Sequence, residues 1–526
     1  MLPSPLNVTT PRPRLRIPGW EFSNSYAALP ARFFARVDPV AVADPRLIKF
    51  NGTLASELGL EWQALDEATL AAIFAGNVVA VGADPIATAY AGHQFGQFVP
   101  QLGDGRALLL GEVIGRDGRR RDIPLKGSGR TPFSRSGDGR AALGPVLREY
   151  LVSESMHSLG IATTRSLAAV TTGEPVFRGA RLPGAVVTRV AASHVRVGTF
   201  EYFAARGDVE AVRRLADYVI ERHYPELESR PYVELLAAVV RRQAALIAGW
   251  MGVGFIHGVM NTDNTAISGE TIDFGPCAFM DGYDPATVFS SIDSHGRYAY
   301  GNQPAMAQWN MARFAETLLT LIDPDDMQRA VDVASPVVDS FREHFEACWI
   351  AGLRRKLGLV TSEEGDPALA GDLLDLMLRT GADYTLTFRR LCEAAATTTG
   401  AGAAAAGAAG APGAPGAATP AAGEIPGAAP PVELAQWIAM WRSRLERDPQ
   451  SPGDRARAMR MANPAYIPRN HRVEAVLAAA TERGDFGPFE EMLQVLSRPY
   501  EEQPGRESYR APPLPSERVL QTFCGT

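Results

Sequence analysis

The feature that most constrains this chain is a short polar segment that ends in the triplet Asp-Phe-Gly. It starts with the string His257–Asn264, which reads HGVMNTDN, and it closes with Asp273–Gly275. Between them, Ala266–Ser268 and Thr271–Ile272 are β-prone arms on either side of Gly269-Glu270, which predicts a two-residue hairpin turn. Because neighbouring strands lie about 4.8 Å apart, such a hairpin would bring side chains at its two open ends to one ion.

Those two ends carry Asn264 and Asp273, and both side chains offer an oxygen ligand. A small number of hard oxygen ligands suits Mg²⁺ or Mn²⁺ that is held jointly with phosphate groups. Either residue alone would be interpreted as a turn or cap residue. Their combination behind a His-Gly loop predicts a metal site.

The same order of residues occurs in protein kinases, where a catalytic Asp lies two residues after the His, and an Asn and the Asp of DFG bind metal. His257 and Asn264 have the kinase spacing, but the position of the base is Val259. A valine cannot accept a proton. Either the site is inactive, or another carboxylate is the base, and Asp263 is the candidate.

A basic, glycine-rich region precedes this segment. Between Gly115 and Arg148, nine Lys or Arg residues are opposed by three Asp residues, although the whole chain has a net charge of −7. The basic residues are Arg116, Arg119, Arg120, Arg121, Lys126, Arg130, Arg135, Arg140 and Arg148. Glycines among them allow backbone N–H groups to approach phosphate oxygens, so the region predicts a polyphosphate cradle. The alternative is a solvated basic face.

Two strands are expected around this region. Ala107–Ile114 has the pattern of one strand, and Asp122–Lys126 begins the next, with Lys126 at its end. The preceding Gly103–Arg106 predicts a tight loop over phosphates. Protein kinases keep their phosphate-binding lysine on a strand in this position.

A helix is predicted over Ala141–Leu159, with Gly160 as its C-terminal stop. Glu149 lies beside the apolar stripe of this helix. In a kinase-like arrangement, a helix glutamate pairs with the strand lysine and holds it on the phosphates. The order of lysine, helix and Asp-Phe-Gly favours that role for Glu149 over the alternative of a surface glutamate.

The rest of the chain is predominantly helical by periodicity, beginning with a long buried helix over Tyr232–Met251. Ala394–Pro431 is almost entirely Ala, Gly, Pro and Thr, which predicts a flexible insertion, and a helical pattern resumes at Val432. The prediction is an α+β, two-lobed, protein-kinase-like fold with N- and C-terminal extensions. Its parts are an N-terminal extension (1–80), a nucleotide-binding N-lobe (81–205), a C-lobe with the catalytic loop (206–393), the insertion (394–431) and a C-terminal helical region (432–526).

Composition excludes several classes of function. The acidic net charge argues against general binding of nucleic acid, and no apolar run is long enough for a membrane-spanning helix. Four scattered cysteines do not form a disulfide framework. We therefore expect a monomeric cytoplasmic protein, or a mitochondrial one in a eukaryote, without stable membrane association.

Longer strings of the sequence resemble the selenoprotein O family. They are Tyr90–Gly96, Gln101–Glu112, Pro124–Glu149, Thr188–Val190, His257–Gly275 and Asn463–His471. The resemblance implies a kinase-like fold that transfers AMP from ATP to Ser, Thr or Tyr hydroxyls of proteins and releases pyrophosphate. It also implies UMP transfer from UTP, and a nucleotide bound in the reverse of the kinase orientation.

The resemblance further implies a role for individual residues. Asp263 is the base, Glu149 orients Lys126, and Asn264 and Asp273 bind Mg²⁺ or Mn²⁺. The nucleotide-binding residues are Gly103, Gly105, Arg106, Lys126, Asp138, Gly139, Arg189, Arg196 and Asp273. Eukaryotic relatives end near a selenocysteine, whereas this chain ends in Phe523-Cys524-Gly525-Thr526. We hypothesise a regulatory disulfide between Cys277 and Cys524, with two unrelated thiols as the alternative.

Two other functions stay open. The first is a kinase that transfers the γ-phosphoryl group, against which Val259 counts. The second is a non-catalytic, nucleotide-binding pseudokinase scaffold. Such a scaffold has little need for the lysine, the glutamate and the metal-binding pair together.

Overall fold

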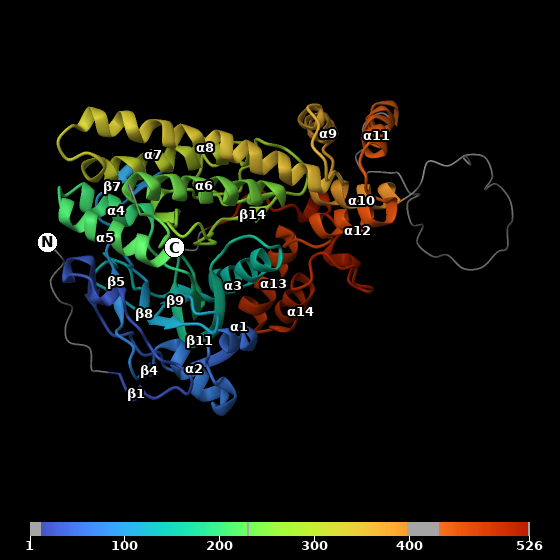
Figure 1. The fold of residues 1–526 in the computed structure, drawn as a ribbon. Coiled ribbons are helices and arrows are strands. Elements are labelled where there is room, and N and C mark those ends of the chain that lie inside the picture. The colour runs from blue at the N-terminus through green and yellow to red at the C-terminus, as the bar shows by residue number, and fades with distance from the viewer. Residues whose placement is uncertain (1–11, 229–230, 397–430, 524–526) are drawn as a thin grey trace.

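The computed structural model describes residues 12–228, 231–396 and 431–523. The fold is mixed α+β with an antiparallel main sheet. Strands dominate the first part of the chain and helices the rest, and the main sheet and the long helices of residues 231–356 lie on opposite sides of the molecule (Figure 1). We call residues 34–190 the sheet region, 197–396 the helical region and 431–523 the C-terminal region.

The main sheet has the strand order β2-β5-β8-β9-β12-β11-β3, and the short β10 pairs with β12. Its neighbouring strands are antiparallel. The strands are β2 (Phe34–Arg36), β3 (Arg46–Phe50), β5 (Ile86–Thr88), β8 (Ala107–Ile114), β9 (Arg120–Lys126), β10 (Ala141–Ala142), β11 (Arg165–Phe177) and β12 (Arg181–Val190). The predicted strand Ala107–Ile114 is confirmed, and the next one begins two residues earlier than predicted.

Helices cover both faces of this sheet. Leu108 and Leu110 of β8 belong to one core cluster, whereas Leu109 belongs to the other, as the alternation of side chains along a strand requires. On one face, α2 (Glu67–Ala75) packs against β3, β11 and β12. On the other face, α3 (Leu143–Ser158) packs against β11 and β12 and places Glu149 over the sheet. The predicted helix is confirmed from Leu143 onward, whereas its first two predicted residues, Ala141 and Ala142, form β10 instead.

The helical region is built around α6 (Pro231–Gly252), which confirms the long buried helix predicted there. It packs against α7 (Gln303–Ile322) and α8 (Met327–Lys356), and the three run side by side in Figure 1. The remaining helices are α4 (Val197–Ala204), α5 (Val209–His223), α9 (Asp366–Thr380) and α10 (Tyr384–Ala396). Within the described part of the chain, no helix combines the length and the apolar character needed to cross a membrane.

The predicted insertion Ala394–Pro431 lies outside the described residues over 397–430. Its ends were placed wrongly: residues up to Ala396 continue α10, whose apolar face packs on the core, and Pro431 begins α11. Pro is compatible with the first turn of a helix because the N–H it lacks there has no helical partner.

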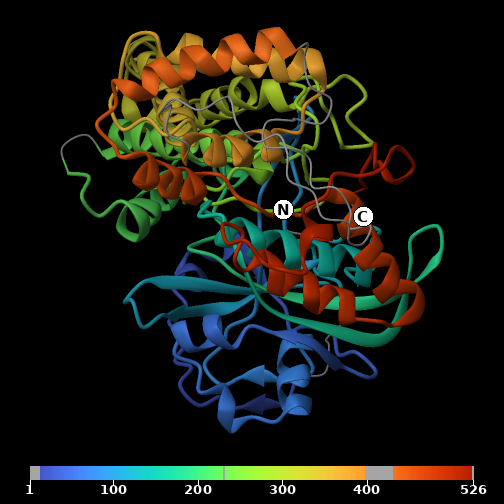
Figure 2. The same ribbon diagram turned by 90° about the vertical axis from the view of Figure 1, so that its right-hand side faces the viewer.

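The C-terminal region returns to the sheet region. It contains α11 (Pro431–Glu446), α12 (Pro452–Ala462), α13 (Asn470–Arg483) and α14 (Gly487–Leu496). Of these, α13 and α14 pack against α3, and both views place them beside it (Figures 1 and 2). The buried Arg469 binds Asp383 at 2.6 Å, which ties this region to the helical region as well.

Short elements complete the fold and several of them surround the site described below. They are α1 (Gly52–Glu57) and the strands β1 (Arg14–Leu15), β4 (Val79–Ala80), β6 (Gly92–Gln94), β7 (Gln97–Val99), β13 (Phe255–Ile256) and β14 (Ala278–Phe279). β1 pairs with β4, β6 with β7, and β13 with β14.

Candidate active site

The hairpin predicted between Asn264 and Asp273 is not formed. Ala266 makes an isolated antiparallel bridge with Arg196, and Thr271 makes a parallel bridge with Thr163. Arms of two or three residues form a marginal hairpin on their own, and here each arm pairs with a neighbouring segment instead. Asn264 and Asp273 are therefore positioned by different parts of the molecule, rather than by each other.

His257 joins the two halves of the motif. Its ring stacks on Trp250, its Nε2 lies 2.9 Å from the carbonyl oxygen of Ile272, and its Nδ1 accepts from the N–H of Val259 at 3.3 Å. Burial lowers the pKa of His257, so the ring stays neutral near pH 7. Its function in this arrangement is to fix the residue before Asp273 against the loop that carries Asp263.

A buried ionic network lies beneath Asp273. The Lys126 ammonium at the end of β9 contacts Glu149 of α3 at 2.7 Å and Asp273 Oδ1 at 2.7 Å. Arg189 of β12 contacts Glu149 and also Asp273 Oδ1, the latter at 3.0 Å. Burial would raise the pKa of Glu149, but the charges of Arg189 and Lys126 outweigh it and hold that pKa below its usual range.

Asp273 is a carboxylate that stays ionised. Burial opposes its charge, but Lys126 and Arg189 hold its pKa well below the usual range. Its backbone has a φ of 67°, a left-handed conformation that Asp tolerates better than most residues. Among the described residues, both of its cationic partners bind Oδ1, so Oδ2 is available to another ligand.

The pKa of Asp263 is shifted in the opposite direction from that of Asp273. It lies in the 3₁₀ turn Thr262–Asn264 with 9% of its surface exposed, and burial raises its pKa to about 7 although Arg196 opposes that shift. Arg196 donates to the backbone oxygen of Asp263 at 2.9 Å, and its guanidinium lies 4.4 Å from the centre of the Tyr90 ring. Among the described side chains, the Asp263 carboxylate accepts one hydrogen bond, from Gln94 Nε2 to Oδ2 at 3.3 Å.

Both carboxylates line one cavity of about 630 Å³. The cavity also contains five of the predicted nucleotide-binding residues: Gly103, Gly105, Arg106, Asp138 and Gly139. Gly103 has a φ of 77°, and a Cβ there would lie 2.4 Å from the ring of Phe133. A Cβ on Gly139 would lie 2.1 Å from the carbonyl oxygen of Gly129. The two positions therefore require glycine.

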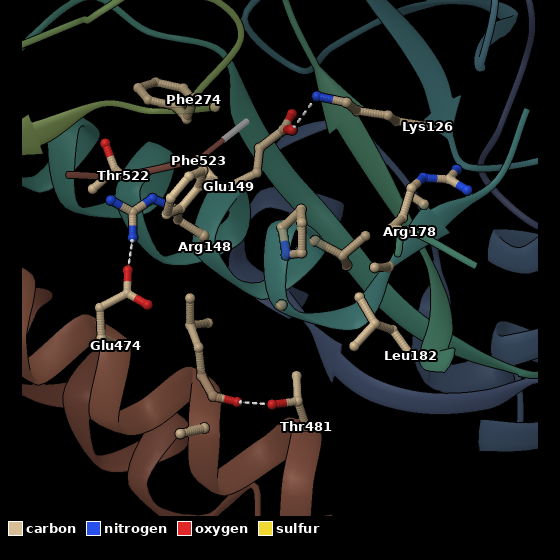
Figure 3. A pocket seen from close by; sticks show the side chains of 18 of the residues that line it. Lys126, Arg148, Glu149, Arg178, Leu182, Phe274, Glu474, Thr481, Thr522 and Phe523 are labelled. Carbon is tan, nitrogen blue, oxygen red and sulfur yellow. Dashed lines mark hydrogen bonds and ion pairs between the residues drawn. The ribbon is translucent and has the colours of Figure 1, made fainter. Parts of the chain in front are cut away.

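A second cavity, of about 440 Å³, is lined by Lys126 and Glu149 (Figure 3). Its walls come from α3, from α13 and from the tail residues 519–523. Arg106 and Arg178 line both cavities. Thr522 fixes the tail there, because its backbone N–H donates to Phe289 at 2.7 Å and its hydroxyl donates to Pro276.

The predicted phosphate cradle is wrong as a single unit, because the fold divides its basic residues. Arg121 pairs with Asp117 at 2.9 Å, Arg120 pairs with Glu112 at 3.2 Å, and Arg148 pairs with Glu474 at 2.7 Å. Arg135 and Arg140 line the first cavity, and Lys126 lines the second. Asp117 and Glu112 are near neighbours in sequence, whereas Glu474 comes from the distant α13, and together these pairs reduce the positive charge available to a ligand.

Some predicted residues do not line the first cavity or lie outside the described chain, and another, Asp138, lines it but is held by an ion pair. Asn264 does not line the cavity; its side-chain N–H₂ donates to the carbonyl oxygen of Val259 at 2.9 Å. Cys277 is buried beside Pro276, and Cys524 lies outside the described residues. Asp138 is held by two hydrogen bonds from Arg178, at 2.7 and 2.9 Å.

Sequence reasoning missed Gln94 and Arg178. Gln94 lies within the string Tyr90–Gly96, which carries part of the family resemblance, but an uncharged amide gives no chemical signal of its own. Arg178 is on the turn between β11 and β12 and resembles any surface arginine in the sequence.

Comparison with known sequences identifies the class of protein to which this chain belongs, the protein nucleotidyltransferases. The sequence model of the family described as protein adenylyltransferase SelO matches residues 18–497, and the chain belongs to this family. Similar relatives, each called protein nucleotidyltransferase YdiU, come from Rhizobium rhizogenes, Rhizobium leguminosarum and a Bradyrhizobium species. The first is 61% identical and the alignment covers 98% of each chain. The second is 62% identical, with 96% of this chain and 97% of the relative covered. The third is 61% identical, with 96% and 99% covered.

Proposed function

We propose that this protein transfers AMP from ATP to Ser, Thr or Tyr hydroxyls of other proteins and releases pyrophosphate, with UTP as an alternative donor of UMP. One observation carries the choice of chemistry. Where a kinase has its base, this chain has the buried Val259, while Asp263, with a pKa of about 7, lines the same cavity as Asp273 and the glycine loop.

We also propose that the sheet and helical regions are the two lobes of a kinase-like fold. The support is the order of parts: a strand lysine, a helix glutamate bound to it, the His257 loop and the Asp-Phe-Gly triplet. The proposed boundaries are an N-lobe over 81–205 and a C-lobe over 206–396, which extends to the end of α10. Residues 1–80 and 431–526 are extensions, and 397–430 is an insertion.

The donor set suits Mg²⁺ or Mn²⁺. Asp273 Oδ2 is available, and the amide nitrogen of Asn264 is committed to Val259, which leaves the amide oxygen as its ligand atom. Among the described residues, no group of three or more His, Cys, Asp or Glu side chains could hold a metal. A cation bound by Asn264 and Asp273 would therefore share phosphate oxygens of the nucleotide, and it would neutralise charge that develops on the α-phosphate.

In the proposed reaction, the oxygen of the substrate hydroxyl attacks the α-phosphorus while its proton passes to Asp263. The bond between the α-phosphorus and the oxygen bridging to the β-phosphorus breaks, and pyrophosphate leaves. Arg189, Arg196 and Lys126 offset the negative charge of the phosphates. A base whose pKa lies near the working pH is well matched to this proton transfer.

The remaining predicted residues surround the nucleotide. Gly103, Gly105, Arg106, Asp138 and Gly139 all line the cavity. Arg178 forms an ion pair with Asp138 in this structure. To contact a nucleotide, Asp138 must either leave Arg178 or bind both at once.

We further propose that Cys277 and Cys524 form a regulatory disulfide. Thr522 binds Pro276, so the described tail reaches the residue next to Cys277 before Cys524 follows in sequence. Thiol counts and activity of the wild type and Cys524→Ala, with and without reductant, test this. The same redox response in both proteins would exclude the disulfide.

The experiment that tests the main proposal uses ATP labelled with ³²P at either the α or the γ position and an extract as the source of acceptors. Label from the α position alone supports nucleotidyl transfer. Label from the γ position would establish a kinase, and ATP binding without transfer of either label would establish a scaffold. Asp263→Asn is the matched control, because it changes one atom of the proposed base.

A further inference from the structure

The strand β6 lies directly against the loop that carries Asp263, although the two are far apart in sequence. The backbone N–H of His93 donates to the Thr262 hydroxyl at 2.6 Å, and the N–H of Phe95 donates to the Asn261 side chain at 3.1 Å. Together with the contact of Gln94 on Asp263, successive residues of this strand bind successive residues of the loop. β6 therefore supports the loop as a unit.

Side chains on both sides make this contact rigid. The His93 ring binds Glu201 of α4 at 2.6 Å, and Glu201 accepts from the Thr262 hydroxyl at 2.5 Å. The Asn261 side chain also accepts from the Tyr298 hydroxyl at 2.7 Å. Fixed neighbours of this kind hold a catalytic group within the narrow range of positions that reaction requires.

The two oxygens of Asp263 have different surroundings. Oδ1 is fully enclosed and has no hydrogen-bond partner among the described residues. It faces Gly92, where an added Cβ would lie only 2.7 Å away. Because Oδ1 is enclosed, Oδ2 is the oxygen that can meet a ligand in the cavity, and Gln94 lines that cavity beside it.

We propose that Gln94 is a positioning residue for the transfer reaction. Its amide N–H fixes the rotation of the Asp263 carboxylate by binding one lone pair of Oδ2, so that another lone pair of Oδ2 accepts the proton of the attacking hydroxyl. Gly92 leaves the space into which Oδ1 fits. This inference rests on the proposed role of Asp263 as the base. It further assigns Oδ2 as the atom that accepts the proton and Gln94 as the residue that orients the carboxylate.

The contact of 3.3 Å is longer than a strong hydrogen bond. Catalytic hydrogen bonds often shorten when substrate completes the site. The Arg196 guanidinium donates to the backbone oxygen of Asp263 and not to the Asp263 carboxylate, which instead accepts from Gln94. Among the described residues, Gln94 is thus the one whose side chain donates a hydrogen bond to the Asp263 carboxylate.

Gln94→Met tests the proposal because it keeps the length of the side chain and removes the donor. We expect kcat to fall about 10- to 100-fold, in the range of lost supporting contacts at catalytic groups, with KM for ATP and nucleotide affinity within about twofold of wild type. Gln97→Met is the matched control, since Gln97 is exposed on β7 directly opposite Gln94 and has no contact with Asp263. Unchanged kcat in Gln94→Met would overturn the proposal.

A double-mutant cycle separates positioning from a general structural role. If Gln94 acts only through Asp263, Gln94→Met causes no further loss in an Asp263→Asn background. A multiplicative loss, or a loss of nucleotide binding in Gln94→Met, would overturn the inference. Full activity of Asp263→Asn alone would instead overturn the proposed base, so the two failures are distinguishable.

Gly92→Ala approaches the same carboxylate from the opposite side and serves as the second variant. We expect it to lower kcat at least as much as Gln94→Met, because the new methyl group displaces Oδ1. Nucleotide affinity, measured by calorimetry, should stay at the wild-type value. Wild-type kcat in Gly92→Ala would contradict the proposed fit of the carboxylate.

Discussion

Asp273 and Asp263 line the same cavity, but their surroundings give the two carboxylates opposite properties. Asp273 lies against Lys126 and Arg189, and its pKa is held well below the usual range. Asp263 is buried with a weak amide contact, and its pKa rises to about 7. A site that separates the pKa values of two like groups can use one as a permanent anion and the other as a proton acceptor.

The largest effect is expected at the permanent anion. Asp273→Ala removes the proposed metal ligand and leaves Lys126 and Arg189 without one of their anionic partners. Loss of metal-assisted charge stabilisation is worth several kcal/mol, which corresponds to a fall in kcat on the order of 1000-fold or more. Transfer of α-³²P label and Mn²⁺ binding in the presence of a non-hydrolysable ATP analogue measure the two consequences.

Asp117→Ala is the control for that variant. Asp117 also pairs with a cation, Arg121, but it is exposed at the turn between β8 and β9. Its replacement should leave transfer unchanged. Wild-type activity of Asp273→Ala would contradict the assignment of the site.

The proposed proton acceptor, Asp263, should give the next largest effect. Asp263→Asn keeps the shape of the side chain and removes its basicity, so we expect kcat to fall about 100- to 1000-fold, within the range for general base catalysis. Nucleotide affinity should remain, in contrast to Asp273→Ala. Equal losses of nucleotide binding in the two variants would remove the distinction between the carboxylates.

The distinction also predicts a pH profile. Asp263 must be ionised to accept a proton, and its pKa is about 7. As pH falls below 7, the fraction of ionised base drops, so kcat/KM should decrease about tenfold per pH unit. Asp273 stays ionised over this range and contributes no such step. Initial rates between pH 5.5 and 8.5, as chosen assay limits, measure the slope, and a flat profile for the wild type would count against Asp263 as the base.

The same comparison shows how far the sequence can predict the molecule. The strand Ala107–Ile114 and the helix at Leu143–Ser158 follow from local periodicity, and the order of motifs was enough to pair Lys126 with Glu149. The pairing of the arms around Gly269 was not predictable, because their partners Arg196 and Thr163 are distant in sequence and outweigh the local turn signal.

The contact between Gln94 and the proposed base, Asp263, could not be predicted for a related reason. Gln94 and Asp263 are 169 residues apart, and only the packing of β6 against the loop brings them together. The basic run misled for the converse reason, since Glu474 and Glu112 reach it through the fold and neutralise part of it. Residue types predict chemistry well, whereas their partners depend on tertiary structure.

The last expected effect is on stability rather than on catalysis, and it compares Asp263 with Glu270, a second buried carboxylate whose pKa burial raises to about 7. A carboxyl group in the unfolded chain has a pKa near 4, so between about pH 4 and pH 7 the folded state binds the proton more tightly, and stability falls as pH rises. Asp263→Asn and Glu270→Gln should remove this loss, each with a gain of at most about 4 kcal/mol at pH 7 and little change at pH 4. Thermal unfolding at the two pH values measures this gain in stability.

Only Asp263→Asn should also lose activity, because the Glu270 carboxylate binds Ser268 and the backbone of Ala192 and does not line the cavity. If the gain in either variant failed to grow with pH, burial would not be the cause of its raised pKa.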